Sequence, residues 1–298
     1  MSEQMERLKQ HREQLAKMTP EQFRQYEYER LRKMVDGRNN EPGELNVDHY
    51  NGVQFIPGDG IDCPLCLNRG FKYDIQFDGK SLPQLLYVNC ECSPRRIYAK
   101  NLLASGLSKA AAKYRFDNFD AVEPWQQAMF DKGKQYVEHG ASEGHWFYAG
   151  GQSGCGKSHI CTAIATELVK SGRLKYIVWP QTVKMLGGLM KDPERYDAEL
   201  NELQSVKYLF IDDLFKPVFR ATGAEALATS MEVKLGYDII NARYNAELVT
   251  IITSEWFSHE LASIDEATAG RIIEACGEYK VDIARNPERN HRITVNVL

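Results

Sequence analysis

Short apolar runs without polar alternation recur through the later part of the chain, at residues 146–149, 176–179, 208–211 and 249–252. Segment 157–170 has the apolar spacing of a helix, and strand-like and helix-like patterns alternate from about residue 116 onward. Strands that are apolar on both faces and separated by helices are typical of a parallel sheet covered on both sides. The pattern therefore predicts an α/β domain over residues 116–298.

The first 40 residues carry alternating charges and two weak helical stripes. The tetrapeptide beginning at Thr19 predicts a helix start, with Thr19 at the N-cap, a proline in the first turn and Gln22 closing a capping box. Gly37 predicts the end of that helix, and the Gly-, Pro- and Asn-rich residues 41–60 are typical of a linker. A small helical hairpin and a partner-docking arm both fit these stripes.

The composition of the chain excludes several classes of protein. With 43% hydrophobic and 26% charged residues among 298, the chain is globular, and wholesale disorder is excluded. Lys and Arg number 37 against 41 Asp and Glu, a net charge of -4, so any nucleic-acid surface has to be a local patch. No apolar run approaches the roughly 20 residues of a membrane span, and the charged N-terminus lacks a signal-peptide core. We therefore expect a cytoplasmic protein in a reducing compartment.

Two close cysteine pairs indicate a metal site. Cys63 and Cys66 have C-x2-C spacing, and Cys90 and Cys92 follow as C-x-C after 23 intervening residues. Four thiolates in two pairs suit tetrahedral zinc, with the residues between the pairs forming a hairpin. Disulfides or buried thiols are the alternatives, and a reducing cytosol disfavours the first. The remaining cysteines have no paired spacing and are expected to be small core or loop residues: Cys155, Cys161 and Cys276.

A phosphate-binding loop stands between the first apolar run and the helical segment. Residues 151–158 read GQSGCGKS, which matches the pattern in full and in the required strand-to-helix setting. Successive backbone N–H groups and the helix N-terminus would surround the phosphates. Lys157 is expected to reach the β- and γ-phosphates, and the Ser158 hydroxyl to ligate Mg2+. The predicted nucleotide-binding residues here are Gly151, Gly154, Cys155, Gly156, Lys157, Ser158 and His159.

A pair of carboxylates ends the third apolar run. Asp212 has the position of the residue that holds Mg2+, and Asp213 that of the base that polarises the attacking water. Adjacent acids at a strand end can also cap a helix, but this alternative weakens beside a phosphate loop. Together the two motifs predict hydrolysis of a nucleoside triphosphate.

An ordered set of further motifs carries a family resemblance. The chain resembles AAA+ replicative-helicase loaders of the DnaC/DnaI type, especially phage and prophage versions, over about residues 61–298. The motifs are Phe116-Asp-Asn-Phe119, Asp212-Asp213-Leu-Phe, Ile239-Ile-Asn-Ala-Arg243-Tyr, Ile252-Thr-Ser-Glu255, Ile264-Asp-Glu-Ala267, Gly270-Arg271-Ile and Asn290-His-Arg292. The resemblance implies an AAA+ P-loop NTPase fold, with a parallel sheet flanked by helices behind a small helical and zinc-ribbon-like module. Because only 27 residues follow Arg271, we expect no full helical lid.

The resemblance also implies roles for single residues. Arg271 looks like an arginine finger that enters the ATP site of a neighbouring subunit, and Arg292 like the second sensor arginine. Phe119 looks like part of the segment that flanks the adenine. Glu255 stands at the first sensor position, where a carboxylate would repel the γ-phosphate unless protonated or turned away. Thr253 or Ser254 is the alternative polar contact.

By this resemblance the protein is an ATPase that uses slow hydrolysis as an assembly switch, with ATP, Mg2+ and Zn2+ as cofactors. Its implied partners are a hexameric replicative helicase, single-stranded DNA and further copies of the chain. An IstB-type transposition ATPase, a P-loop small-molecule kinase and a zinc-dependent adaptor with a degenerate ATP site are the alternatives. Lys184, Lys191 and Arg195 compete with the basic stretch 95–115 as the DNA-contacting segment.

These patterns predict four successive regions. A helical arm covers residues 1–50, and a zinc-binding module covers residues 51–98. A basic linker over residues 99–115 then leads to the AAA+ domain, residues 116–298.

Overall fold

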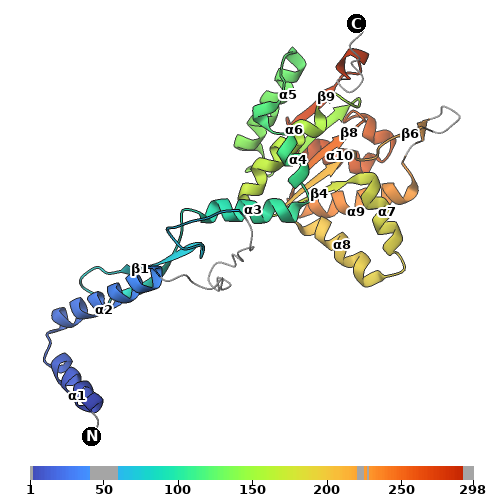
Figure 1. Ribbon diagram of the computed structural model, residues 1–298. Coiled ribbons are helices and arrows are strands. Elements are labelled where there is room, and N and C mark those ends of the chain that lie inside the picture. Colours follow the sequence, from blue (N-terminus) through green and yellow to red (C-terminus); the bar gives the residue numbers. More distant parts are fainter. Residues whose placement is uncertain (1–2, 41–59, 220–224, 227, 291–298) are drawn as a thin grey trace. The chain divides into compact units, whose positions relative to one another are not determined.

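A computed structural model describes residues 3–40, 60–219, 225–226 and 228–290 (Figure 1). The chain forms two compact units, residues 1–100 and 101–298. Within the described ranges, no helix is both long and apolar enough to cross a membrane.

The first unit contains two helices and a hairpin. Its elements are α1 (Glu3–Ala16), α2 (Pro20–Asn40), β1 (Phe71–Gln76), β2 (Gln84–Asn89) and the start of α3 (Ser93–Ser105). The predicted capping box is present, since Gln22 N donates to Thr19 Oγ1 and Thr19 N donates to Gln22 Oε1. The predicted end at Gly37 is wrong. Helix α2 continues to Asn40 because its last turn is bonded to the rest of the unit.

The end of α2 is tied to the hairpin by polar contacts. Asn39 exchanges two hydrogen bonds with the Tyr73 backbone, each 2.9 Å long, and Arg69 donates to the Asn39 carbonyl at 2.9 Å. Further along the helix, the Tyr28 ring stacks on Phe77 with centroids 4.9 Å apart. The arm and the cysteine module therefore form one body, with one face of the hairpin covered by α2.

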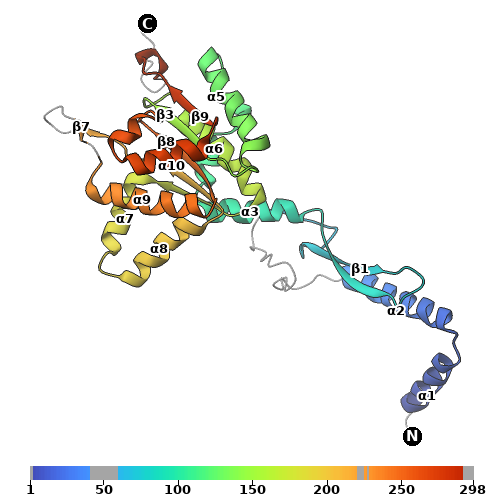
Figure 2. The same ribbon diagram turned by 180° about the vertical axis from the view of Figure 1, so that it is seen from behind.

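The second unit is built on a five-stranded parallel sheet in the order β4-β5-β8-β3-β9 (Figures 1 and 2). Its strands are β3 (Phe147–Gly151), β4 (Leu174–Val178), β5 (Tyr208–Asp212), β8 (Val249–Ser254) and β9 (Lys280–Ile283). Its α-helices are α4 (Ser108–Lys113), α5 (Pro124–Gln135), α6 (Lys157–Leu168), α7 (Trp179–Leu189), α8 (Pro193–Ser205), α9 (Ser230–Asn245) and α10 (Glu266–Cys276). Short strands β6 (Val218–Phe219) and β7 (Glu225–Ala226) pair antiparallel.

The four predicted strands and the parallel sheet are confirmed. Strand β9 was missed, because a four-residue strand with Lys280 and Asp282 in it carries no continuous apolar run. Trp179, predicted as the end of a strand, instead begins α7. After α10 the described part of the chain contains β9 and a 3-10 turn, Pro287–Arg289.

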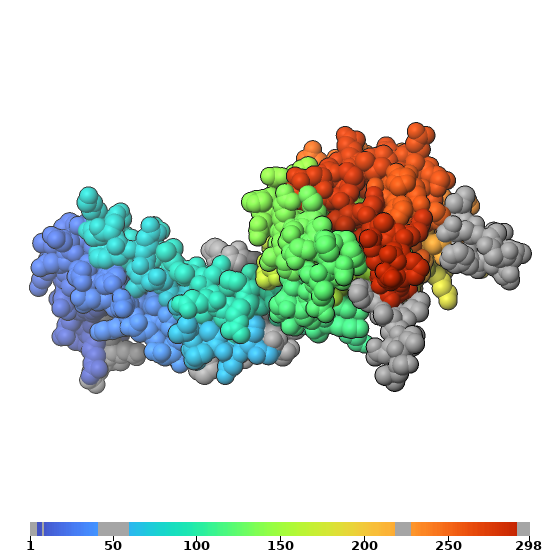
Figure 3. Space-filling view, turned by 90° about the horizontal axis from the view of Figure 1, so that it is seen from above, coloured from blue at the N-terminus to red at the C-terminus, as the bar shows by residue number. Residues whose placement is uncertain are grey.

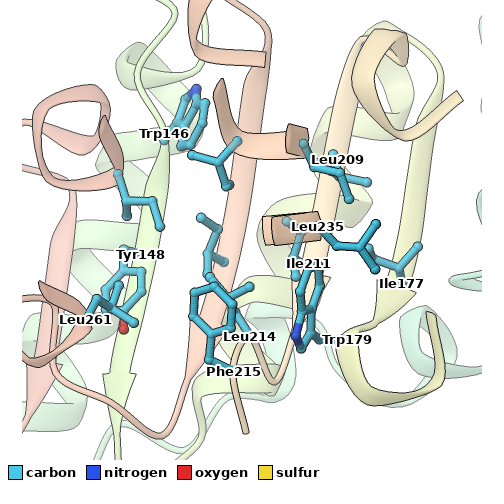
Figure 4. Close-up of a cluster of buried hydrophobic side chains, with 14 of the residues drawn as sticks. Trp146, Tyr148, Ile177, Trp179, Leu209, Ile211, Leu214, Phe215, Leu235 and Leu261 are labelled. Carbon is cyan, nitrogen blue, oxygen red and sulfur yellow. The ribbon is translucent and has the colours of Figure 1, made fainter. Parts of the chain in front are cut away.

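The sheet is covered on both faces. Leu209 and Ile211 share a buried cluster with Leu235 of α9 (Figure 4). Phe210, which lies between them in sequence, is also buried and points to the opposite face, because side chains alternate along a strand. Helix α6 packs against the sheet on that opposite side. Figure 3 shows the green surface of α5 beside the red C-terminal part of this unit, and α5 contacts β9. This layering leaves the carboxyl ends of the strands open for a site.

The predicted basic linker, residues 99–115, is largely helical. Its residues complete α3, form α4 and then enter a 3-10 turn, Phe116–Asn118. Leu, Ala and Lys are strong helix formers and dominate the segment.

A buried arginine bonded to carbonyl groups lies in the second unit. Arg243 of α9 is 0% exposed and donates to the carbonyls of Leu203, Val206 and Val249 and to the Thr250 hydroxyl, at 2.6–3.0 Å. Burial lowers the pKa of its guanidinium to about 9. Its donors satisfy carbonyls at the end of α8 and the start of β8, so it joins two elements that are distant in sequence.

Arg243→Met is expected to destabilise the second unit by about 3–5 kcal/mol, because buried carbonyls lose their donors. Denaturant unfolding of the full chain would measure the change. Arg173→Met is the matched control: its side chain is 72% exposed and pairs with Glu202 at the surface, so its effect should stay within about 1 kcal/mol. Equal effects of the two substitutions would contradict the structural role of Arg243.

Candidate functional site

The phosphate loop connects the end of β3 to the start of α6. Gly151, Gly154 and Gly156 have φ angles of +125°, +80° and +91°, a region that favours glycine. A Cβ at Gly151 would lie 2.4 Å from the Ile283 carbonyl oxygen, and one at Gly156 would lie 3.3 Å from both Met129 and Phe119. The glycines are therefore required both by backbone conformation and by close packing.

Lys157 and Ser158 occupy the first turn of α6. The buried Lys157 ammonium donates to the carbonyls of Gly151 (2.8 Å) and Gln152 (2.7 Å), so it lies against the loop that it follows. Ser158 Oγ donates to Asp212 Oδ1 at 3.0 Å. A hydroxyl and a carboxylate, the ligand types that Mg2+ prefers, thus meet at the ends of β3 and β5.

Asp212 is held by three hydroxyls. Besides Ser158, Thr253 donates to Oδ1 and Tyr176 donates to Oδ2 at 3.0 Å. Burial raises the pKa of Tyr176, and the Asp212 carboxylate raises it further, so this phenol stays neutral and acts as a donor. Thr253 Oγ1 also accepts from Asp213 N at 2.9 Å, which fixes both carboxylate-bearing residues to β8.

An open cavity of about 320 Å3 lies over the loop. Its lining residues are Tyr114, Ser153, Gly154, Gly156, Lys157, Ser158, His159, Asp212, Asp213 and Glu255. Thr253 and Ser254, the alternative sensor contacts, are 0% exposed, and Ser254 Oγ donates to the Leu214 carbonyl at 2.7 Å. Of the three residues considered for the first sensor, Glu255 is the one that lines this cavity.

A second cavity, of about 540 Å3, adjoins the loop on the side of α5. Phe119, Cys155 and His159 all line it, and the Phe119 and His159 rings meet edge to face with centroids 5.0 Å apart. His159 Nε2 is 2.9 Å from the Arg115 carbonyl, and burial lowers the pKa of this imidazole. An aromatic wall beside the phosphate loop suits a planar nucleobase.

Of the two arginines assigned by resemblance, the structure describes Arg271. Arg271 of α10 donates to the Ala267 carbonyl at 2.9 Å, and its guanidinium lies 5.2 Å from the Tyr237 ring centroid and 6.0 Å from that of Tyr244. It is not among the described residues that line the loop cavity of its own chain. Arg292 lies outside the described residues.

The four paired cysteines come together in the first unit. The sulfur atoms of Cys63, Cys66, Cys90 and Cys92 all lie within 4.8 Å of one another, with Cys63 3.7 Å from Cys90 and Cys66 3.5 Å from Cys92. Tetrahedral zinc with bonds of about 2.3 Å places its sulfur ligands about 3.8 Å apart. All four thiols are free and buried, so the cluster fits a zinc centre with four cysteine ligands.

Hydrogen-bond donors and burial act in opposite directions on the ionisation of these thiols. Gly70 N donates to Cys66 Sγ at 3.2 Å, and the Arg96 guanidinium donates to Cys92 Sγ at 3.4 Å. Burial raises the pKa of Cys66 to about 12. At Cys63 burial acts the same way, but backbone N–H groups outweigh it and lower the pKa of that thiol to about 7. A bound cation would stabilise the ionised form of every ligand.

The two basic segments proposed for DNA differ in exposure. Lys184, Lys191 and Arg195 are exposed on or beside α7 and α8. Arg96 is only 5% exposed and donates to Ile61 O and Asn68 Oδ1 as well as to the cysteine cluster. Arg96 therefore supports the zinc module, and the basic stretch loses one of its candidate DNA contacts.

Sequence reasoning missed three residues that line the loop cavity or contact its carboxylates. Tyr176 and Tyr114 come from elements distant in sequence, and no motif points to them. Lys216 forms an ion pair with Asp213 at 2.7 Å and lies 3.7 Å from Glu255 Oε1. A lysine three residues after Asp213 could have indicated an ion pair in the sequence. Whether the two side chains meet depends on the conformation of the turn between them.

Comparison with known proteins places the chain in a family, although no family model matches it. It is 31% identical over 240 residues to the phage-like element PBSX protein XkdC of Bacillus subtilis, covering 78% of this chain and 86% of XkdC. It is also 28% identical over 151 residues to the replicative helicase loader DnaI of the same species, covering 49% of this chain. The chain belongs to the family of DnaC/DnaI helicase loaders and related phage-element proteins.

Coverage differs among the members of this family. The chain spans 66% of the length of YqaM of Bacillus subtilis, at 30% identity over 211 residues, and 45% of the length of DnaI. The crystal structure of the DnaC helicase loader matches with a TM-score of 0.50 and 22% identity, covering 59% of this chain and 99% of that chain. This likeness shows the AAA+ fold, in agreement with the fold predicted from the motifs.

Proposed function

We propose that this protein is an ATP-dependent loader that places a hexameric replicative helicase on single-stranded DNA in the cytoplasm. The observation that carries the proposal is the convergence of Lys157, Ser158 and Asp212 at one cavity, in a member of the helicase-loader family. The cavity offers a cation, a hydroxyl and a carboxylate at the end of a phosphate loop. This combination suits Mg2+-dependent binding of a nucleoside triphosphate.

Each residue of the cavity has a chemical role in the proposed hydrolysis. Lys157 binds the β- and γ-phosphates, and Ser158 and Asp212 hold Mg2+, which neutralises phosphate charge when bound. Asp213 orients and polarises the attacking water. Phe119 and His159 contact the base from the adjoining cavity. Glu255 acts near the γ-phosphate as the first sensor.

Arg271 completes the site from a neighbouring subunit in this proposal. A guanidinium stabilises the charge on the transferring phosphoryl group, but Arg271 lies against Tyr237 and Tyr244 of its own chain. Hydrolysis then depends on self-association of the AAA+ unit, which makes ATP an assembly switch. Arg292 would act as the second sensor.

In this proposal the other parts of the chain bind the helicase and the DNA. The zinc module and the helical arm form one unit and would bind the helicase, while the exposed Lys184 and Lys191 are the candidate contacts to DNA phosphates. The close approach of the four cysteine sulfur atoms supports zinc as the metal of this module.

A pull-down with candidate hexameric replicative helicases would test the proposal. The full chain should retain its helicase, and the retained amount should change several-fold between ATP and ADP. Asp213→Asn, which keeps the magnesium ligand Asp212, should hold the ATP-bound form and prolong the complex.

Lys170→Ala is a suitable control, because this lysine pairs with Glu167 at the surface and should leave retention unchanged. Retention of a transposase but of no helicase would favour the transposition ATPase instead. Absence of any nucleotide effect would reject the switch.

A further inference from the structure

The turn after β5 has an unusual backbone conformation. Asp213 and Phe215 have φ angles of +61° and +50°, which side-chain-bearing residues rarely adopt. Such conformations persist where the surrounding structure fixes them, and they concentrate at functional sites. Hydrogen bonds between this turn and β8, or the residues that follow β8, hold the turn in place. Leu214 N donates to the Thr253 carbonyl, and Trp256 Nε1 donates to the Phe215 carbonyl.

The hydrophobic core holds the same turn. Leu214 and Phe215 are 0% and 2% exposed and lie in the buried cluster, where the Phe215 ring meets Trp179 edge to face (Figure 4). With these two side chains directed inward, the flanking Asp213 and Lys216 are directed to the other side of the turn. Their side chains meet there, with Lys216 Nζ 2.7 Å from Asp213 Oδ2.

Lys216 also approaches the sensor residue. Its ammonium lies 3.7 Å from Glu255 Oε1, so one cation stands between two carboxylates, which directly follow β5 and β8. Three carboxylates line the loop cavity, those of Asp212, Asp213 and Glu255, whereas Lys157 is the sole Lys or Arg among the lining residues in the described ranges. A triphosphate entering this cavity meets more negative than positive side chains.

We propose that Lys216 is a specificity-determining residue that makes the site selective for a γ-phosphate. In the nucleotide-free site Lys216 pairs with Asp213 and offsets the charge of Glu255. When ATP binds, the γ-phosphate attracts the Lys216 ammonium, and Asp213 is released to act on the attacking water. ADP lacks this phosphate, so it leaves the ion pair in place. The inference rests on the proposed ATP hydrolysis and adds the group that distinguishes ATP from ADP.

Lys216→Met removes the charge and keeps an unbranched side chain that is one atom shorter. We expect it to weaken ATP binding about 10- to 100-fold, as for loss of one hydrogen bond between charged groups, with little effect on ADP. Lys216→Arg should retain most of the preference for ATP, because it keeps the cation. Calorimetric titration with ATP and with ADP would measure the nucleotide preference. Single-turnover hydrolysis would measure the release of Asp213 to act on water. Lys234→Met, an exposed position on α9, is the control and should match the unmodified protein.

Charge compensation provides a second test. Glu255→Gln in the Lys216→Met background should restore part of the preference for ATP, because one unpaired carboxylate is removed. If Lys216→Met does not fold, Glu255→Gln alone serves instead and should raise the ratio of ATP to ADP affinity several-fold. An unchanged or lower ratio would overturn the inference.

The outcomes separate this inference from the proposed function. If the unmodified protein fails to bind ATP, the proposed function itself is wrong. If it binds and hydrolyses ATP while Lys216→Met keeps the same nucleotide preference and rate, only the role of Lys216 is rejected.

Discussion

Lys157→Ala is expected to weaken ATP binding by about 100-fold or more, because the charge-assisted contacts to the β- and γ-phosphates are lost. The Lys157 ammonium is bonded to the carbonyls of Gly151 and Gln152. It is thus already held at the loop, and alanine at this position removes a preorganised cation. Calorimetric titration of the full chain with ATP in the presence of Mg2+ would measure the loss.

Two comparisons make this result specific. Lys170→Ala removes an exposed lysine just beyond the same helix and should leave the ATP affinity unchanged. Asp213→Asn should keep ATP binding but lower the hydrolysis rate by about 100-fold or more, because an amide cannot accept the proton from water. Tight ATP binding by Lys157→Ala would reject the assignment of the loop.

Removal of zinc is expected to unfold the first unit and to spare the second. The described part of the first unit buries few large apolar side chains, and its cysteines are its most completely buried cluster. Binding of structural zinc contributes about 10–16 kcal/mol in small modules, far more than such a core supplies. Elemental analysis should find about one zinc per chain.

Cys90→Ser is the sharpest variant, because Cys90 lies at the end of β2 and its backbone N–H bonds to the Gly70 carbonyl at 2.7 Å. The variant should lose zinc, and limited proteolysis should digest residues 1–100 while ATP binding by the second unit remains. Cys161→Ala, which removes a thiol of α6 outside the cluster, should keep its zinc. A metal-free protein with a protease-resistant first unit would contradict the zinc assignment.

The sequence by itself determined the local elements of both sites. The phosphate loop, the paired acids after β5 and the two cysteine pairs each depend on spacings of a few residues. Their backbone geometry is set by neighbours in the chain, such as glycines at positive φ and a helix that begins at Lys157. The parallel sheet was equally predictable, because strands buried on both faces have to be apolar throughout.

The tertiary structure decided which side chains complete those sites. Tyr176 reaches Asp212 only because β4 lies beside β5 in the sheet, and the strand order is not written in any local pattern. Lys216 meets Asp213 and Glu255 because the burial of Leu214 and Phe215 fixes the direction of the turn. These contacts depend on packing between residues about 40 positions apart, which short-range preferences do not encode.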